Sequence, residues 1–386
     1  MSAPIKSLLA QNGNQIRLLE AHDSVSRELV RNGQGINGDM FHGIWMSGLT
    51  QTTYLGVPDT ELISPLERAS AMADRNFIEP TNSRCIGAAF DADSGGDKSD
   101  IDGLVQTLAR QGVSMIIIED KAVSKPGDKV NSLKASSEAQ PQMDPLLFAK
   151  EIQAFRKASE GLDMLITARI ESFIVRHPEK TEAEEKISVE AALHDALHRA
   201  SIYCDAGVDA IMIHSKIRSP AEVLQFIQEF RASDPITPLV VVPTTYGATT
   251  EDVLYAAGAN VIIYANHLMR AKIQAVAEFT KRFMKDRSHL PTDDEDFKAC
   301  IKTQNYGYLL QLLMCRGPLS AVAKWYRILA ETYAMEHMAL VVEQLLDGKT
   351  AGAADKEIIP VKKLLEINAH QLSPLEPLRG GEAFAH

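Results

Sequence analysis

Short apolar runs alternate with longer amphipathic segments eight times between Arg17 and Lys285, and this alternation restricts the possible fold most strongly. A short apolar run rich in β-branched residues predicts a buried strand, and a longer segment with helical periodicity predicts a helix. Eight such pairs in roughly 270 residues are typical of a (β/α)8 TIM-type barrel. The expected strands are 17–21, 43–47, 85–91, 114–119, 163–169, 210–214, 238–243 and 260–264, and the expected helices are 24–32, 64–76, 100–112, 145–159, 188–207, 220–233, 250–258 and 266–285.

An open, doubly wound α/β sheet is the alternative to a barrel. Such a sheet carries a glycine-rich phosphate turn after its first strand. Here the first expected strand is followed by His22, Asp23 and Ser24 instead. Glycines 112, 207 and 258 stand where a helix ends and the next strand begins, as left-handed C-terminal caps do. The sequence therefore favours the barrel.

The chain divides into four parts. We expect an N-terminal segment at 1–16, the catalytic barrel at 17–285, a helical C-terminal region at 286–371 and a flexible tail at 372–386. A charged, proline-containing linker opens the C-terminal region. Helices are expected there at 296–316, 318–345 and 356–368.

Composition narrows the possible partners. A formal charge of −11 argues against a nucleic-acid backbone or an anionic membrane as the main partner. No apolar run is long enough to span a bilayer, and the polar N-terminus lacks the order of a signal peptide. The 4 cysteines lie far apart, which is typical of buried thiols in a reducing compartment. We expect a cytoplasmic protein that acts on a small molecule.

Carboxylates gather at the expected strand ends. Asp91 and Asp93 follow the third strand, Glu119 ends the fourth, and Asp59 lies in the loop after the second. The carboxyl ends of barrel strands share one rim, so these side chains would repel each other without a cation between them. Oxygen ligands of this kind suit Mg²⁺ or Mn²⁺, whereas no histidine pair has zinc-ligand spacing. The sequence predicts a divalent metal site.

Anion-binding groups are expected on the same rim. Arg169 and His214 end the fifth and sixth strands, and Trp45 precedes a turn over 47–49 whose backbone N–H groups can point inward. Ser47, Gly48 and Leu49 form that turn. An anion site beside a metal suits a substrate with carboxylate and phosphoryl groups.

A loop with Lys125 and Lys129 follows the fourth strand, and its composition is typical of a mobile segment. Each of these features also has a purely structural interpretation. Asp-x-Asp can be a helix cap, His214 can be a satisfied rim histidine, and Arg169 can simply pair with Glu171. The shared location at one rim favours the functional interpretation.

Several motifs together resemble the phosphoenolpyruvate mutase family of the isocitrate lyase superfamily. The resemblance runs in order from about residue 17 to 285, and these enzymes are (β/α)8 barrels. Its motifs are Gly43-Ile-Trp-Met-Ser-Gly-Leu49, Leu55-Gly-Val-Pro-Asp59, Asp91-Ala-Asp93, Glu119-Asp-Lys121 with Asn131-Ser132, Ala168-Arg-Ile-Glu171, Met212-Ile-His-Ser215, Val242-Pro-Thr-Thr-Tyr246 and Ala265-Asn-His267 with Arg270.

The resemblance implies Mg²⁺-dependent interconversion of phosphoenolpyruvate and phosphonopyruvate, with phosphorus moving between oxygen and carbon. It makes Asp91 the direct metal ligand and lets Asp59, Asp93 and Glu119 act largely through bound waters. It assigns the pyruvoyl portion of the substrate to Trp45, Ser47, Gly48 and Leu49. It assigns the phosphoryl end to Arg169, His214, Asn131 and Ser132. It places Lys129 in the gating loop as a catalytic residue and Lys125 in the same loop as a substrate-binding residue.

Two relatives and a non-catalytic role are the alternatives. Lyases of the superfamily carry a catalytic cysteine in the gating loop, and residues 119–132 contain none. Phosphonopyruvate hydrolase has a Thr-Ser pair where this chain has Asn131-Ser132, so the pair favours the mutase. A scaffold role is disfavoured by the complete set of strand-end carboxylates.

The chain departs from the family pattern in two places that matter for function. The segment between Lys121 and Asn131 is four residues longer than in the mutase pattern. Extra helix also precedes 358–366, which resembles the closing helix of the family. Because that helix is exchanged between neighbouring barrels in the superfamily, we expect a homodimer or homotetramer. A downstream enzyme that drains the product is also expected.

Overall fold

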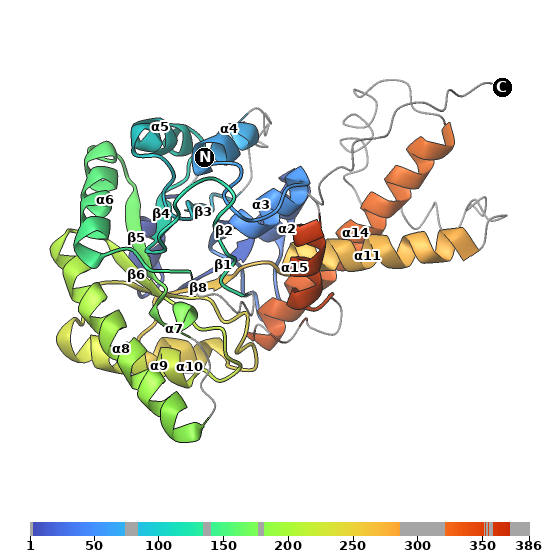
Figure 1. The fold of residues 1–386 in the computed structure, drawn as a ribbon. Helices are drawn as coiled ribbons and strands as arrows, with labels where there is room; N and C mark the ends of the chain where they lie inside the picture. Colours follow the sequence, from blue (N-terminus) through green and yellow to red (C-terminus); the bar gives the residue numbers. More distant parts are fainter. Residues whose placement is uncertain are drawn as a thin grey trace.

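Eight parallel strands close into a barrel in chain order, with helices around it (Figure 1). The computed structural model describes residues 3–73, 84–133, 140–176, 181–285, 321–350, 352, 354 and 358–370. The strands are β1 Ile16–Glu20, β2 Gly43–Met46, β3 Gly87–Asp91, β4 Met115–Glu119, β5 Leu165–Ile170, β6 Ala210–Ile213, β7 Leu239–Val241 and β8 Val261–Tyr264. The predicted (β/α)8 barrel is confirmed.

The apolar strand runs arise because both faces of the sheet are buried. In β4, Met115 and Ile117 pack inside the barrel with Leu18 and Val261. Their neighbour Ile116 points the other way, into the layer between the sheet and the helices. The register pairs Glu119 with Arg169, so these two side chains emerge together at the carboxyl rim.

The helices follow the strands as predicted, with two additions and one displaced boundary. They are α2 Ser24–Asn32, α4 Pro65–Ala73, α5 Ile101–Arg110, α6 Pro145–Ala158, α8 Glu182–Asp205, α9 Ala221–Ser233, α10 Glu251–Ala257 and α11 His267–Lys285. Short helices α3 Gly48–Leu55 and α7 Ser172–Val175 were not predicted. The predicted start of α8 at 188 was wrong, because Thr181 and Glu184 form a capping box that begins the helix earlier.

The N-terminal segment closes the bottom of the barrel. It contains helix α1, Ile5–Gln11, which buries Ile5 and Leu8. A Cβ atom on Gly87 would come within 2.9 Å of both side chains, so only glycine lets the helix approach β3 this closely. The Ile5 N–H also donates to Ser114 Oγ at 3.0 Å. The N-terminal end of the barrel is therefore covered by this helix.

The C-terminal region packs against the barrel helices. Helix α14, Ala321–Gly348, lies along α11 and contacts α2, and α15, Val361–His370, lies against α3 (Figure 1). The helix expected at 296–316 and the tail at 372–386 lie outside the described residues. Because α15 packs on its own barrel in the single chain, exchange of this helix with a second copy stays a prediction.

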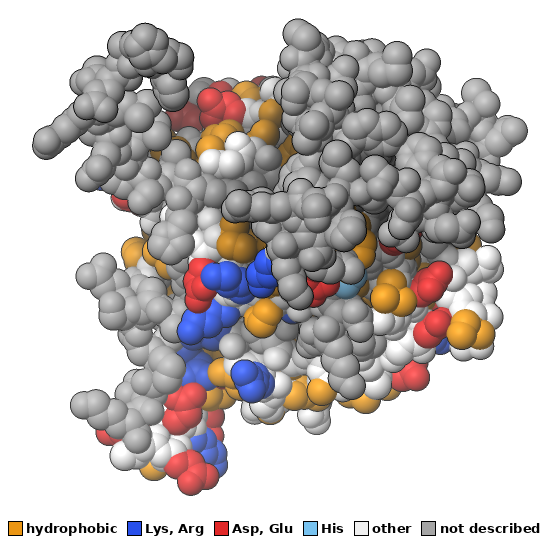
Figure 2. Space-filling model, turned by 90° about the vertical axis from the view of Figure 1, so that its right-hand side faces the viewer, with side chains coloured by type: hydrophobic (Ala, Val, Ile, Leu, Met, Phe, Trp, Pro, Cys, Tyr) orange, Lys and Arg blue, Asp and Glu red, His pale blue; other side chains and the backbone are white. Residues whose placement is uncertain are grey.

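Figure 2 shows the side of the molecule that carries α14 and α15, where acidic, basic and apolar side chains are interspersed. Within the described part of the chain, none of the helices is both long and apolar enough to cross a membrane.

Candidate active site

A cavity opens at the carboxyl ends of the strands and is lined by most of the predicted site residues. It brings together side chains from the ends of β2, β3, β5 and β6 and from two loops, 56–61 and 122–133. The predicted residues that line it are Trp45, Ser47, Leu49, Asp59, Asp91, Lys129, Asn131, Ser132, Arg169 and His214. Lys125 does not.

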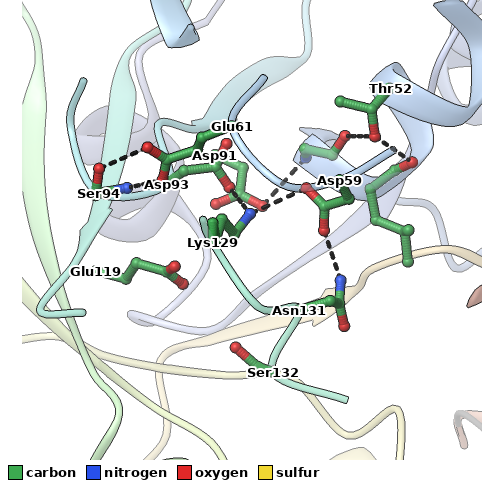
Figure 3. Close-up of polar contacts among 12 residues, drawn as sticks. Thr52, Asp59, Glu61, Asp91, Asp93, Ser94, Glu119, Lys129, Asn131 and Ser132 are labelled. Atoms are coloured by element: carbon green, nitrogen blue, oxygen red, sulfur yellow. Dashed lines mark hydrogen bonds and ion pairs between the residues drawn. The ribbon is translucent and has the colours of Figure 1, made fainter. Parts of the chain in front are cut away.

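Two of the predicted metal ligands, Asp59 and Asp93, pair with one cation of the protein itself. The Lys129 ammonium lies 3.0 Å from Asp59 Oδ1 and also contacts Asp93 Oδ1 (Figure 3). Asp93 Oδ2 accepts from Arg68 Nη2 at 2.7 Å. Asp91 Oδ2 accepts from the backbone N–H of Gly48 at 3.1 Å. The side chains are almost fully buried, so these charges attract one another with little screening by water.

The pKa values follow from burial and from this pairing. Burial and the neighbouring Asp93 carboxylate raise the pKa of Asp91 to about 6. Burial would also raise the pKa of Asp93, but the charges of Lys129 and Arg68 lower it below its usual value. Burial alone would lower the pKa of Lys129, whereas Asp59 and Asp93 hold it well above the usual range. The Lys129 side chain therefore stays a cation.

The turn after β2 approaches the carboxylates through its backbone. A Cβ on Gly48 would lie 3.0 Å from Asp93 Oδ1 and 3.3 Å from Asp91 Oδ2, so a larger residue would displace these groups. Gly48 is also the first residue of α3, where free N–H groups favour negative charge. Its N–H group, predicted to meet a substrate carboxylate, donates to Asp91 in this structure.

A second cluster surrounds Arg169. Its Nε donates to Glu171 Oε1 at 2.5 Å and its Nη2 to Ser132 Oγ at 2.6 Å. The His214 Nε2 atom lies 2.6 Å from the same Glu171 oxygen. Burial would raise the pKa of Glu171, but Arg169 and Lys121 hold it well below its usual value. Burial lowers the pKa of His214, so the imidazole is neutral near pH 7.

The sequence also allowed a purely structural role for Arg169, in which it only pairs with Glu171, and the structure contains this contact. The same guanidinium also lines the cavity and lies 3.1 Å from Glu119 Oε2. Arg169 is thus held in one orientation by Glu171 and Ser132 while part of it faces the cavity. This arrangement can present a fixed positive charge to an anion.

The loop after β4 folds over the cavity and is fastened at its far end. Asn131 Nδ2 donates to Asp59 Oδ2 at 2.5 Å, and Lys121 Nζ donates to Ser132 Oγ at 2.5 Å (Figure 3 shows Asn131, Asp59 and Ser132). The prediction that Lys125 binds substrate does not fit this arrangement. Its side chain is 73% exposed, and its ammonium lies 3.9 Å from Asp128 rather than in the cavity.

Sequence reasoning missed several residues of the site. Arg68 on α4 donates to the Asp91 carbonyl, to Asp93 and to Gln51. Glu61 accepts from the N–H and hydroxyl of Ser94, and burial with the nearby Asp93 raises its pKa to about 7. Thr244 also lines the cavity. Arg68 could not be found from strand ends, because it enters the site from a helix.

The donor set fits a hard divalent cation, although the ammonium of Lys129 now lies among the carboxylates. Asp59, Asp91 and Asp93 supply oxygen ligands. The buried Glu119 oxygens accept no hydrogen bond and lie 3.1 Å from Arg169 and 3.5 Å from Lys121. Among the described residues, no group of three or more His, Cys, Asp and Glu side chains is arranged to hold a metal without rearrangement. The assigned metal ligands therefore stay a prediction.

The fold and the site define a barrel enzyme with carboxylates and basic groups at the strand ends. The family model described as phosphoenolpyruvate phosphomutase matches residues 5–284. The phosphoenolpyruvate phosphomutase of Tetrahymena pyriformis is 30% identical over 70% of this chain and 80% of its own length. The chain therefore belongs to the phosphoenolpyruvate phosphomutase family and is an enzyme of that family.

Two further relatives show how the family extends. A solved phosphoenolpyruvate phosphomutase from Streptomyces platensis subsp. rosaceus has 30% sequence identity and a TM-score of 0.60, covering 73% of this chain and 86% of that one. The phosphonopyruvate hydrolase of Variovorax sp. (strain Pal2) is 30% identical over 64% of this chain and 76% of its own length. Family membership alone therefore leaves two reactions open.

Proposed function

We propose that the protein interconverts phosphoenolpyruvate and 3-phosphonopyruvate, forming the carbon–phosphorus bond of phosphonates. The observation that carries the proposal is the position of Asn131. This side chain donates to the Asp59 carboxylate at 2.5 Å at the end of a loop that folds over the cavity. Because the residue reaches the cavity from the covering loop, it supports a reaction that water must not enter.

Phosphoryl transfer of this kind needs positioning and charge stabilisation more than a strong protein nucleophile. Arg169 and neutral His214 are suited to hold the phosphoryl group, with Asn131 and Ser132 completing its surroundings from the loop. Trp45, Ser47 and Leu49 form the wall where the pyruvoyl portion would lie.

Asp91, with Asp59, Asp93 and Glu119, would hold Mg²⁺ or Mn²⁺. The bound metal would supply positive charge next to the enolate oxygen. Lys129 keeps a positive charge at the same place when the loop is closed, since its ammonium contacts Asp59 and Asp93. The proposal extends to a cytoplasmic homo-oligomer with barrel 17–285 as the catalytic part and a product-draining enzyme downstream.

Hydrolysis of phosphonopyruvate is the second candidate, because a hydrolase is among the relatives. It would require water to reach the phosphoryl group beneath the loop. The longer segment between Lys121 and Asn131 could admit water to the cavity and so favours hydrolysis. The Asn131-Ser132 pair favours the mutase instead.

A coupled assay separates the two reactions. Purified protein, Mg²⁺ and phosphonopyruvate are incubated with lactate dehydrogenase and NADH, with or without ADP and pyruvate kinase. Oxidation of NADH that requires ADP and pyruvate kinase identifies phosphoenolpyruvate as the product and supports the proposal. Oxidation at the same rate without them identifies pyruvate and refutes it. Asp91→Ala is the control, and it should abolish both signals.

A further inference from the structure

The C-terminal helix reaches the loop that carries Asp59. Asn368 lies on α15, and its side chain is 4% exposed, although the residue is more than 300 positions away from that loop in the sequence. Its Oδ1 atom accepts the backbone N–H of Asp59 at 2.7 Å. A buried amide in direct contact with the backbone of a predicted site residue calls for a function.

The amide group of Asn368 also donates, and all of its acceptors belong to the same part of the barrel. Its Nδ2 atom lies 2.9 Å from Thr53 Oγ1, 3.1 Å from the Val57 carbonyl and 3.4 Å from Thr52 Oγ1. These groups lie at the end of α3 and at the start of the 56–61 loop. One side chain thus joins the end of α3 to the loop that follows it.

Both of these elements continue into the site. Thr52 Oγ1 donates to the Gly48 carbonyl at 2.8 Å, and the N–H of Gly48 donates to Asp91 (Thr52 and Asp91 are labelled in Figure 3). Asp59 accepts from Lys129 and Asn131, and the Thr60 carbonyl accepts the N–H of Gly127 at 3.0 Å. The 56–61 loop therefore lies between α15 on one side and the covering loop on the other.

We propose that Asn368 is a positioning residue, which fixes the Asp59 loop and through it the closed position of residues 127–131. The inference rests on the proposed function only in giving Asp59 a role in metal binding. An asparagine suits this position because its oxygen accepts one backbone N–H while its two amide N–H groups donate to neighbouring oxygens. A side chain without these groups would leave the Asp59 N–H and the Val57 carbonyl buried and unpaired.

Packing of α15 is a separate contribution and provides a matched control. Leu364 is fully buried on the same helix, in an apolar cluster with Leu49, Met269 and Ile359. The Ile359 carbonyl also accepts from Arg270 Nε at 2.6 Å. Leu364→Ala would loosen the helix without removing any hydrogen bond to the Asp59 loop, whereas Asn368→Leu keeps the size of the side chain and removes all of them.

The test compares the full-length protein with Asn368→Leu and Leu364→Ala by hydrogen exchange and by thermal unfolding. Asn368→Leu should raise exchange roughly tenfold in peptides covering 57–61 and 127–131. Leu364→Ala should raise exchange in α15 and lower the unfolding midpoint, with little effect on the two loops.

Unchanged exchange in 57–61 for Asn368→Leu would overturn the proposal. The same loop exchange in both variants would also overturn it, because packing of the helix rather than the amide would then hold the loop. Exchange does not depend on turnover. Failure of the wild-type protein to form phosphoenolpyruvate would therefore refute the proposed function and leave the exchange result as a separate answer.

Discussion

Replacing Lys129 with methionine should destabilise the metal-free protein strongly and the metal-loaded protein little. The Lys129 ammonium pairs with Asp59 and Asp93, and the three side chains are only 4%, 4% and 1% exposed. Removing one partner of a buried ion pair costs about 3–5 kcal/mol because the remaining charge is left uncompensated. We therefore expect a loss of about 4 kcal/mol in the free energy of unfolding of the metal-free protein. Bound Mg²⁺ would supply the missing positive charge and restore most of the lost free energy of unfolding.

Urea denaturation measures the free energy of unfolding of the metal-free protein in EDTA and of the metal-loaded protein in saturating Mg²⁺. Lys125→Met is the matched control, since this lysine is in the same loop but 73% exposed, and the change should cost less than about 1 kcal/mol. Calorimetry should also show tighter Mg²⁺ binding to Lys129→Met, because the ammonium no longer competes for the carboxylates. Equal losses for the two variants in EDTA, or a loss for Lys129→Met that Mg²⁺ does not reduce, would refute the account of the carboxylate cluster.

Three further predictions concern the same site. The affinity for Mg²⁺ should be constant above pH 6 and fall up to tenfold per pH unit below pH 6. The reason is that the Asp91 carboxyl, whose pKa is raised to about 6, must lose its proton to bind metal. A calorimetric affinity that stays constant down to pH 5 would contradict this prediction. Asn131→Thr should shift the product from phosphoenolpyruvate toward pyruvate and phosphate, and an unchanged product ratio in the coupled assay would remove Asn131 from the account. Arg68→Met should lower kcat/KM at least tenfold by releasing Asp93, whereas Arg110→Met, which alters an exposed residue away from the site, should not.

Strand positions and most of the site could be predicted from the sequence because both depend on local patterns. Buried parallel strands are continuous apolar runs, and the polar residue that ends each run must lie on the same rim. Asp91, Glu119, Arg169 and His214 were found in this way. The closed arrangement of eight strands then follows from their number and spacing.

The missed features depend on contacts between distant segments. Arg68 enters the carboxylate cluster from a helix, and Asn368 enters from the far end of the chain. No periodicity marks either residue. The early start of α8 is different, since Thr181 and Glu184 have capping-box spacing that could have been recognised. Lys125 and Lys129 could not be distinguished by composition, because the folded path of the loop decides that Lys129 lines the cavity while Lys125 is exposed.

Phosphorus NMR of the purified protein with Mg²⁺ and phosphonopyruvate tests the proposed reaction most directly. The account predicts a phosphoenolpyruvate resonance that grows as the phosphonopyruvate resonance falls, with no inorganic phosphate at early times. The signal should disappear in Asp91→Ala. Inorganic phosphate as the first product would contradict the mutase assignment and favour hydrolysis, and an unchanged phosphonopyruvate resonance would contradict both.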